Sequence, residues 1–156
     1  MAAVIVKGDP VSGSDTHAVT GQAATPAGPA AYAGTATYPY DGTMTEELSD
    51  LVTIGDAPVA TVDSRSSLRS GHLAGTGAPP FDPPATPALT PTPATFVFTA
   101  TVGTGAPAEG AGSSFVTVGG SAVLLDGDKL DTCGDERGSG NSAVTSAGQS
   151  FVTVAG

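Results

Sequence analysis

Ser114–Val118 reads SFVTV, and the same five residues return as Ser150–Val154. A looser copy, LVTI, stands at Leu51–Ile54. In each copy β-branched residues alternate with polar ones or with side chains of the opposite face, and Gly or Ala-Gly follows at once. This alternation is typical of a short strand that ends in a tight turn. The repeat therefore predicts a mainly β chain built on one recurring unit.

The two inner copies continue into a second strand. Val52–Asp63 (VTIGDAPVATVD) and Val116–Asp128 (VTVGGSAVLLDGD) both run strand, glycine turn, strand, acidic turn, which predicts the same β-hairpin twice. Val4–Pro10 matches the closing half of this unit, and the segment that ends at Gly156 matches its opening half. We therefore expect the two chain ends to complete one hairpin, with both termini at one end of the body.

Composition limits both the core and the partners. The 156 residues include 22 Gly, 13 Pro and no Trp, and the hydrophobic share of 39% is mostly Ala and Val. We expect a single domain, residues 1–156, of short β-hairpins joined by long Pro-, Gly- and Ala-rich loops, with little helix. Fifteen acidic against five basic residues give a net charge of −10. Such a charge repels phosphate and anionic lipid, so we expect no nucleic-acid partner and no stable membrane association.

Two biased stretches and one apolar run lie between the units. Gly21–Gly34 and Gly75–Pro93 are dense in Ala, Pro, Gly and Thr. Because proline removes backbone donors, both stretches predict extended surface loops. Thr95–Val102 predicts a further strand, whose alternation puts Phe96 and Phe98 on one face as core residues.

Three smaller signals indicate ordinary structural roles. Thr43–Leu51 is the one candidate for a helix, a turn too short to build an α domain. Tyr32, Tyr38 and Tyr40 could stack on a sugar or a partner, but aromatic residues beside prolines more often pack a loop down. Asp126–Asp131 suggests a calcium loop but lacks the spacing of acidic residues that an EF-hand needs, which indicates a solvated turn.

His17, His72 and Cys133 are the only His and Cys residues, and each falls in a glycine-rich turn after a repeat unit. Two imidazoles and a thiolate are good Zn²⁺ ligands, with iron as the alternative ion, and a structural site takes four ligands. The candidates for a fourth ligand are water and nearby carboxylates, namely Asp15, Asp131 and Asp135. The alternative is three unrelated loop residues, because spacings of 55 and 61 residues carry no local metal signature.

The N-terminal apolar run stops at Lys7, which is shorter than the hydrophobic region of a signal peptide, and no later run approaches a membrane span. Cys133 alone cannot form a disulfide within the chain, so no feature marks an oxidising compartment. We expect synthesis in the cytoplasm without a signal peptide.

Several of these motifs resemble the PAAR family. Lys7–Gly13 (KGDPVSG) resembles the opening Gly-Asp-Pro-Thr-Ser stretch of PAAR proteins, and His17 follows where that family often places a metal-binding residue. Pro58–Asp63 (PVATVD) resembles part of the family's Pro-Ala-Ala-Arg, Val-Gly-Asp stretch but lacks the arginine. Ser121–Gly134 keeps the Gly-Asp turn and puts Cys133 where the family has His or Cys.

The resemblance spans nearly the whole chain as a rhythm of short motifs, and it implies a mechanical role. A PAAR-like protein is a compact β cone that caps the blunt end of a trimeric VgrG-like or phage-spike-like protein, with a metal ion near its apex. It sharpens the spike of a type VI secretion system, phage tail or extracellular contractile particle, and it is ejected on contraction to help pierce the target envelope. Effector proteins are a further class of partner. Three units around Val4, Val52 and Val116 could present three comparable edges to such a threefold spike.

Two other classes of function are weighed against this one. An exported adhesin or surface-exposed β module fits the Thr, Ala and Pro richness and the acidic charge, but it predicts a signal peptide or anchor. A metalloenzyme needs an exchangeable water on its metal, and a thiol enzyme could draw only two groups from Cys133 with His17 or His72. No activating motif surrounds Cys133, so we expect no enzymatic activity.

Overall fold

The computed structural model describes residues 1–25, 27–68, 81–82, 97–98, 104–132 and 140–154. Its strands, in chain order, are β1 (Ala2–Ala3), β2 (Pro10–Thr25), β3 (Gly28–Glu46), β4 (Thr53–Ile54), β5 (Ala57–Pro58), β6 (Arg65–Leu68), β7 (Phe81–Asp82), β8 (Val97–Phe98), β9 (Thr104–Pro107), β10 (Thr117–Val118), β11 (Ser121–Ala122), β12 (Lys129–Asp131), β13 (Ser142–Val144) and β14 (Thr153–Val154). Helix is absent from these ranges, which confirms the prediction of a mainly β fold. The same ranges hold no helix that is long and apolar enough to cross a membrane.

Six of these strands pair in a closed antiparallel ring, which we call the barrel. β2 pairs with β3, β3 with β6, β6 with β9, β9 with β12, β12 with β13, and β13 again with β2. The strands approach closely at glycines: a Cβ on Gly105 would lie 2.6 Å from Ser66 Oγ. Closure leaves no unpaired sheet edge around the ring.

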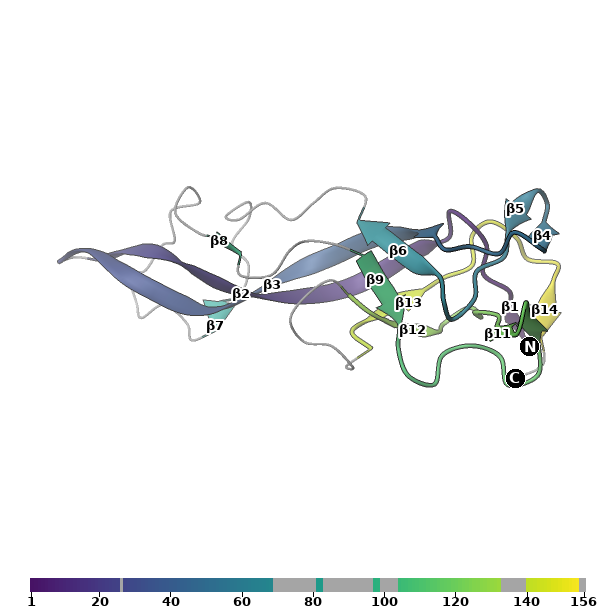
Figure 1. Cartoon of the computed structure of the whole chain (residues 1–156). Coiled ribbons are helices and arrows are strands. Elements are labelled where there is room, and N and C mark those ends of the chain that lie inside the picture. Colours follow the sequence, from purple (N-terminus) through teal and green to yellow (C-terminus); the bar gives the residue numbers. More distant parts are fainter. Residues whose placement is uncertain (26, 69–80, 83–96, 99–103, 133–139, 155–156) are drawn as a thin grey trace.

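Three short hairpins close one end of the barrel, and we call them the base. They are β4–β5, β10–β11 and β14–β1. In the third hairpin the C-terminal strand pairs with the N-terminal one, with Thr153 opposite Ala3, as Thr53 stands opposite Pro58 in the first. The prediction that the chain ends complete one hairpin is therefore confirmed, and Figure 1 shows both termini at this end of the molecule.

The closing strands of the three hairpins meet around one axis. Ile5, Ala60 and Leu124 occupy equivalent positions there, and each is 0% exposed. The backbone N–H of Ile5 donates to the carbonyl of Leu124 at 2.9 Å, that of Leu124 to Ala60 at 3.0 Å, and that of Ala60 to Ile5 at 2.9 Å. Because each unit donates to one neighbour and accepts from the other, the base has a threefold backbone arrangement in a single chain.

Contacts on both sides of this axis repeat the same cycle. Antiparallel bridges join Val4 to Leu125, Val59 to Val6, and Val123 to Thr61. The acidic turns are equivalent too: Asp9 Oδ2, Ser64 Oγ and Asp128 Oδ2 accept from the backbone N–H of Val6, Thr61 and Leu125 at 2.8, 2.9 and 2.8 Å. Thus the repeat of the sequence is a repeat of hydrogen bonds as well.

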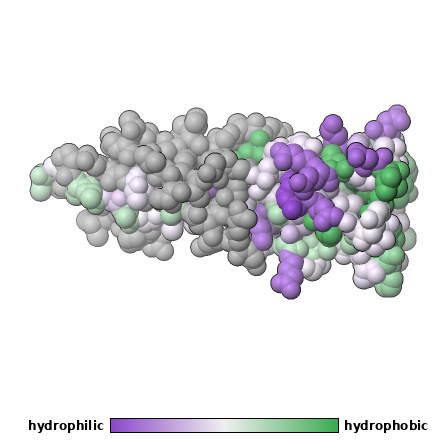
Figure 2. Space-filling model, in the orientation of Figure 1, coloured by the Kyte–Doolittle hydropathy of each residue, from purple (hydrophilic) through white to green (hydrophobic). Residues whose placement is uncertain are grey.

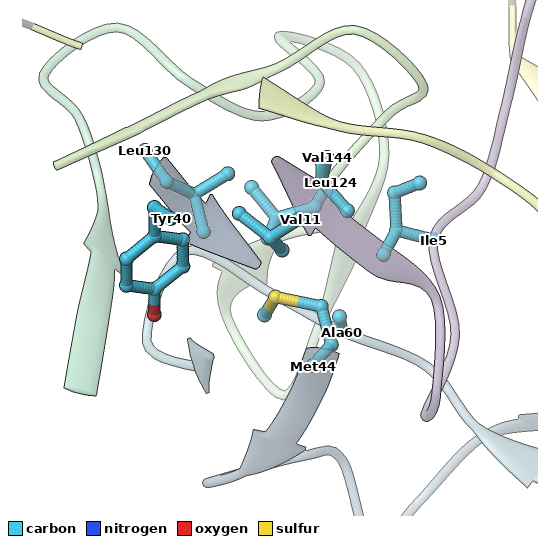
Figure 3. Close-up of a cluster of buried hydrophobic side chains, with 8 residues drawn as sticks. All are labelled: Ile5, Val11, Tyr40, Met44, Ala60, Leu124, Leu130 and Val144. Carbon is cyan, nitrogen blue, oxygen red and sulfur yellow. The ribbon is translucent and has the colours of Figure 1, made fainter. Parts of the chain in front are cut away.

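The core lies where the barrel meets the base (Figure 3). Its members are Ile5, Val11, Tyr40, Met44, Ala60, Leu124, Leu130 and Val144. A second apolar cluster, centred on Val4, Val59 and Val123, lies between the base hairpins. Burial of each large aliphatic side chain stabilises the fold by roughly 1.5–3 kcal/mol, so the base and the adjoining barrel carry most of the apolar stabilisation seen in the described residues.

The prediction of a surface loop at Gly21–Gly34 is wrong. These residues belong to β2 and β3, whose pairing runs without interruption from Pro10 opposite Thr43 to Thr25 opposite Gly28. Ala24 stands opposite Pro29. Proline is tolerated there because a strand of a two-stranded ribbon has an outer edge that needs no N–H donor. The resulting hairpin, with strands of 16 and 19 residues, is far longer than the short hairpins that were expected.

The helical candidate Thr43–Leu51 is also wrong. Its first residues end β3 and pair with β6, with Met44 buried in the core. Glu47 then takes a positive φ of 53°, which ends the strand. Alternating threonines around a buried Met favour a strand with one face on the core.

The three tyrosines pack down as predicted, since Tyr32, Tyr38 and Tyr40 are all buried. Of the second predicted loop and the predicted strand Thr95–Val102, only Phe81–Asp82 and Val97–Phe98 are described; they pair with β3 and β2 as β7 and β8. The rest of both segments, Phe96 included, lies outside the described residues.

Candidate functional site

His17 lies in the β2–β3 hairpin just beyond the core, opposite Ala36. Its side chain is fully buried, and its Nε2 lies 3.0 Å from Oδ2 of the equally buried Asp15. The ring meets Tyr38 edge-on, with ring centroids 6.2 Å apart. Burial also raises the pKa of Tyr38 above its ordinary value of 10.0. The imidazole therefore sits in a dry pocket with a carboxylate on one ring nitrogen.

The same carboxylate reaches a distant part of the chain. Asp15 Oδ1 accepts a hydrogen bond of 2.7 Å from the hydroxyl of Thr132, at the end of β12. Thr132 is held in turn by Asn141, whose amide nitrogen donates to its hydroxyl at 3.1 Å and whose amide oxygen accepts from its backbone N–H at 3.2 Å. Asp15 thus joins β2 to the residue that immediately precedes Cys133.

The other two predicted metal ligands, His72 and Cys133, lie outside the described residues. Within the ranges that are described, no group of three or more His, Cys, Asp or Glu side chains could hold a metal ion. The shared metal site therefore stays a prediction.

The structure describes two of the three carboxylates considered as a fourth ligand. Both oxygens of Asp15 accept hydrogen bonds, and Asp131 Oδ1 accepts from the backbone N–H of Gly140 at 2.9 Å. Asp135 lies outside the described residues.

One regularity in the sequence concerns these ligands and becomes visible only with the axis in view. β2, β6 and β12 are the strands that leave the base after its three turns. Counted from the axial residues, His17 is 12 residues after Ile5 and His72 is 12 residues after Ala60, by direct subtraction of their numbers. Each candidate ligand is thus on, or follows, a strand that leaves the base.

A second candidate site is the outer surface of the base. Leu51, Phe115 and Phe151 are 75%, 76% and 72% exposed, and they occupy the same position in the three hairpins. Figure 2 shows hydrophobic side chains at the end of the molecule where Figure 1 places the base hairpins. Three large apolar side chains, equally exposed and related by the repeat, form what we call the apolar triad.

The triad is held outward by one recurring turn. The backbone N–H groups of Leu51, Phe115 and Phe151 donate to Ser49 Oγ, Ser113 Oγ and Gln149 Oε1, each at 3.1 Å. The next residue in each unit donates to the same oxygen. Because the backbone is fixed in the same way three times, the exposure of these side chains is a built feature. The sequence signal for it, a large apolar residue at one position of every repeat, was assigned to a strand and not to a surface.

Charge does not follow the repeat. A cavity of about 300 Å³ beside Leu51 is lined by Glu47, Asp50 and Asp63 together with apolar residues. At the position of Asp50 the other two units carry Ser114 and Ser150. What the three units share at the surface is therefore apolar.

No protein-family model matches this sequence, and comparisons with curated proteins and with solved structures gave no match.

Proposed function

We propose that this chain is the tip of a contractile injection spike, similar in kind to PAAR proteins, and that it caps a trimeric VgrG-like or phage-spike-like partner through its base. The apolar triad carries this proposal. A homotrimer ends in three identical surfaces, and one chain can contact all three alike only if it repeats its own surface three times. The cycle of hydrogen bonds among Ile5, Ala60 and Leu124 supports such a repeat.

The chemistry of the triad supports a docking role. Large apolar side chains that are held exposed on a small protein are typical of an interaction surface. Covering each of Leu51, Phe115 and Phe151 is worth roughly 1.5–3 kcal/mol. Three such contacts at 120° intervals would also hold the tip centred on the spike, which a single patch would not.

The rest of the molecule supports a mechanical role without catalysis. The β2–β3 hairpin extends away from the base (Figure 1), so with the base on the spike this hairpin points toward the target envelope. The closed barrel resists splaying because every strand in it has two neighbours. In this proposal the chain is assembled into the particle and leaves with the spike on contraction.

A Zn²⁺ or iron ion held by His17, His72 and Cys133 belongs to the proposal as a cross-link between strands that leave the base. The buried imidazole of His17 fits such a role because its Nε2 is already fixed by Asp15 and Nδ1 would be the coordinating atom. When bound, the ion supplies rigidity where the molecule has few large side chains.

Binding to a purified trimeric spike protein tests the docking. Changing Leu51, Phe115 or Phe151 to Asp should each weaken binding at least about tenfold, because a charge would replace a buried apolar contact. Ala31→Asp, an equally exposed apolar-to-acid change on β3 far from the base, is the matched control and should bind as the wild type does. Binding that is insensitive to all three changes, or absent for every trimeric spike tried, would contradict the proposal and favour the exported adhesin.

A further inference from the structure

We propose that Asp15 is a positioning residue of the metal centre and not one of its ligands, and that His17 coordinates through Nδ1. This inference rests on the metal site of the proposed function. It assigns a role to a carboxylate that the sequence alone leaves among the possible ligands.

The first step concerns the carboxylate oxygens. Oδ2 of Asp15 lies 3.0 Å from His17 Nε2, and Oδ1 accepts the Thr132 hydroxyl at 2.7 Å. Asp15 is 0% exposed. Coordination of an ion would require one of these two hydrogen bonds to break in a buried site, where a lost partner is costly.

The second step concerns the ring. An ionised carboxylate only accepts hydrogen bonds, so Nε2 of His17 carries the proton and donates it to Asp15. A histidine with this tautomer presents its lone pair at Nδ1. Carboxylates commonly fix metal-binding histidines in this manner, which orients the ring and makes it a better donor.

The third step concerns Thr132. This residue immediately precedes Cys133, and its hydroxyl is bonded to the same carboxylate that holds His17. One buried side chain therefore connects the strand that carries one candidate ligand to the strand that leads to another. Loss of Asp15 would loosen both connections together.

Cobalt(II) titration of the metal-free protein tests this role, because thiolate-to-cobalt absorption reports the ligands directly. Asp15→Asn should weaken cobalt binding by about 10–100-fold, the usual cost of removing a carboxylate behind a metal-binding histidine. The number and positions of the absorption bands should not change, since no ligand is lost. Thr132→Val should act in the same direction by a smaller factor, because Asp15 would still hold His17.

The matched control is Asp131→Asn, which alters a carboxylate two residues before Cys133, as Asp15 is two residues before His17. Asp131 caps Gly140 and makes no contact with His17 among the described interactions, so its change should leave cobalt affinity as in the wild type. Equal effects of both changes, or no effect of Asp15→Asn, would overturn the inference. Altered bands in Asp15→Asn would make Asp15 a ligand and overturn it as well.

Nitrogen-15 NMR of the zinc-loaded wild type decides the point if the Asp15 variant does not fold. We expect His17 to show a metal-bound Nδ1 and a protonated Nε2. Coordination through Nε2 would refute the inference while leaving the metal site in place. A wild-type protein that binds neither zinc nor cobalt would remove the metal site itself, and the docking of the base would remain to be judged by its own binding assay.

Discussion

The base and the arm, which we define as the β2–β3 hairpin from Ala18 to Thr35, are both built from β-hairpins but are stabilised differently. In the base, three hairpins direct Ile5, Ala60 and Leu124 to one axis, where all are buried. The arm has small and uncharged side chains, since no Asp, Glu, Lys or Arg occurs in it. Tertiary burial therefore stabilises the base, whereas backbone pairing is the main interaction along the arm. The difference teaches that a substitution should cost most at the axis and least in the arm.

The largest expected effect is at the axis itself. Leu124→Ala removes a fully buried side chain next to Ile5 and should lower the free energy of unfolding by about 2–5 kcal/mol. Thr20→Ala, an exposed change in the arm, should stay within about 0.5 kcal/mol. Chemical denaturation followed by circular dichroism measures both. Similar costs at the two positions would show that the arm and the base are not stabilised differently.

The next effect distinguishes the three turns of the base from one another. Asp9 accepts from Val6 through Oδ2 and from Ala147 and Gly148 through Oδ1, at 2.7–2.8 Å, whereas Ser64 accepts from Thr61 alone. Asp9→Ala should therefore cost roughly 1.5–3 kcal/mol or more, because hydrogen bonds to a charged group are lost. Ser64→Ala should cost about 1 kcal/mol.

Thermal and urea unfolding of the two cap variants give the order of their stabilities. If Ser64→Ala proved the more damaging, the equivalence of the turns would have to be attributed to the backbone and not to the caps.

The smallest effect concerns alkaline pH near the junction of arm and barrel. Burial raises the pKa of Tyr38 in the folded state, so the folded chain keeps a proton that the unfolded chain loses above about pH 10. Its contribution to stability is therefore complete below that pH and declines as pH rises further. Tyr38→Phe should flatten the loss of stability above pH 10 in a pH series of unfolding curves. An unchanged slope in the variant would assign the alkaline loss to other groups.

The sequence predicts the base well because its signal is local and repeated. Alternation in Val116–Asp128 and its copy at Val52–Asp63 specifies a strand, a turn and a second strand without reference to the rest of the chain. The chain ends follow by the same logic, since β1 and β14 are halves of one unit.

The arm was missed because its composition conceals its periodicity. Ala36, Tyr38, Tyr40, Gly42 and Met44 are buried in strict alternation. Gly and Pro among their neighbours make the same stretch read as a loop. Thr43–Leu51 was taken for a helix for a similar reason, since its one buried side chain, Met44, belongs to this alternation and not to a helical face.

The candidate site could be predicted only in part. His17 was named as a ligand from its residue type, but its partners depend on contacts across the barrel. Thr132 is 117 residues from Asp15 in the sequence. No local pattern indicates that pair, and closure of the ring through β12 and β13 is what brings it together.

The central claim is that one chain with a threefold base caps a trimer, and native mass spectrometry of the chain mixed with a purified trimeric spike tests it most directly. The account predicts a complex of one tip chain with three spike chains, and no larger complex at excess tip. Three tip chains per trimer, each on its own spike subunit, would contradict the account, because the base would then serve as three separate copies of a site and not as one threefold surface.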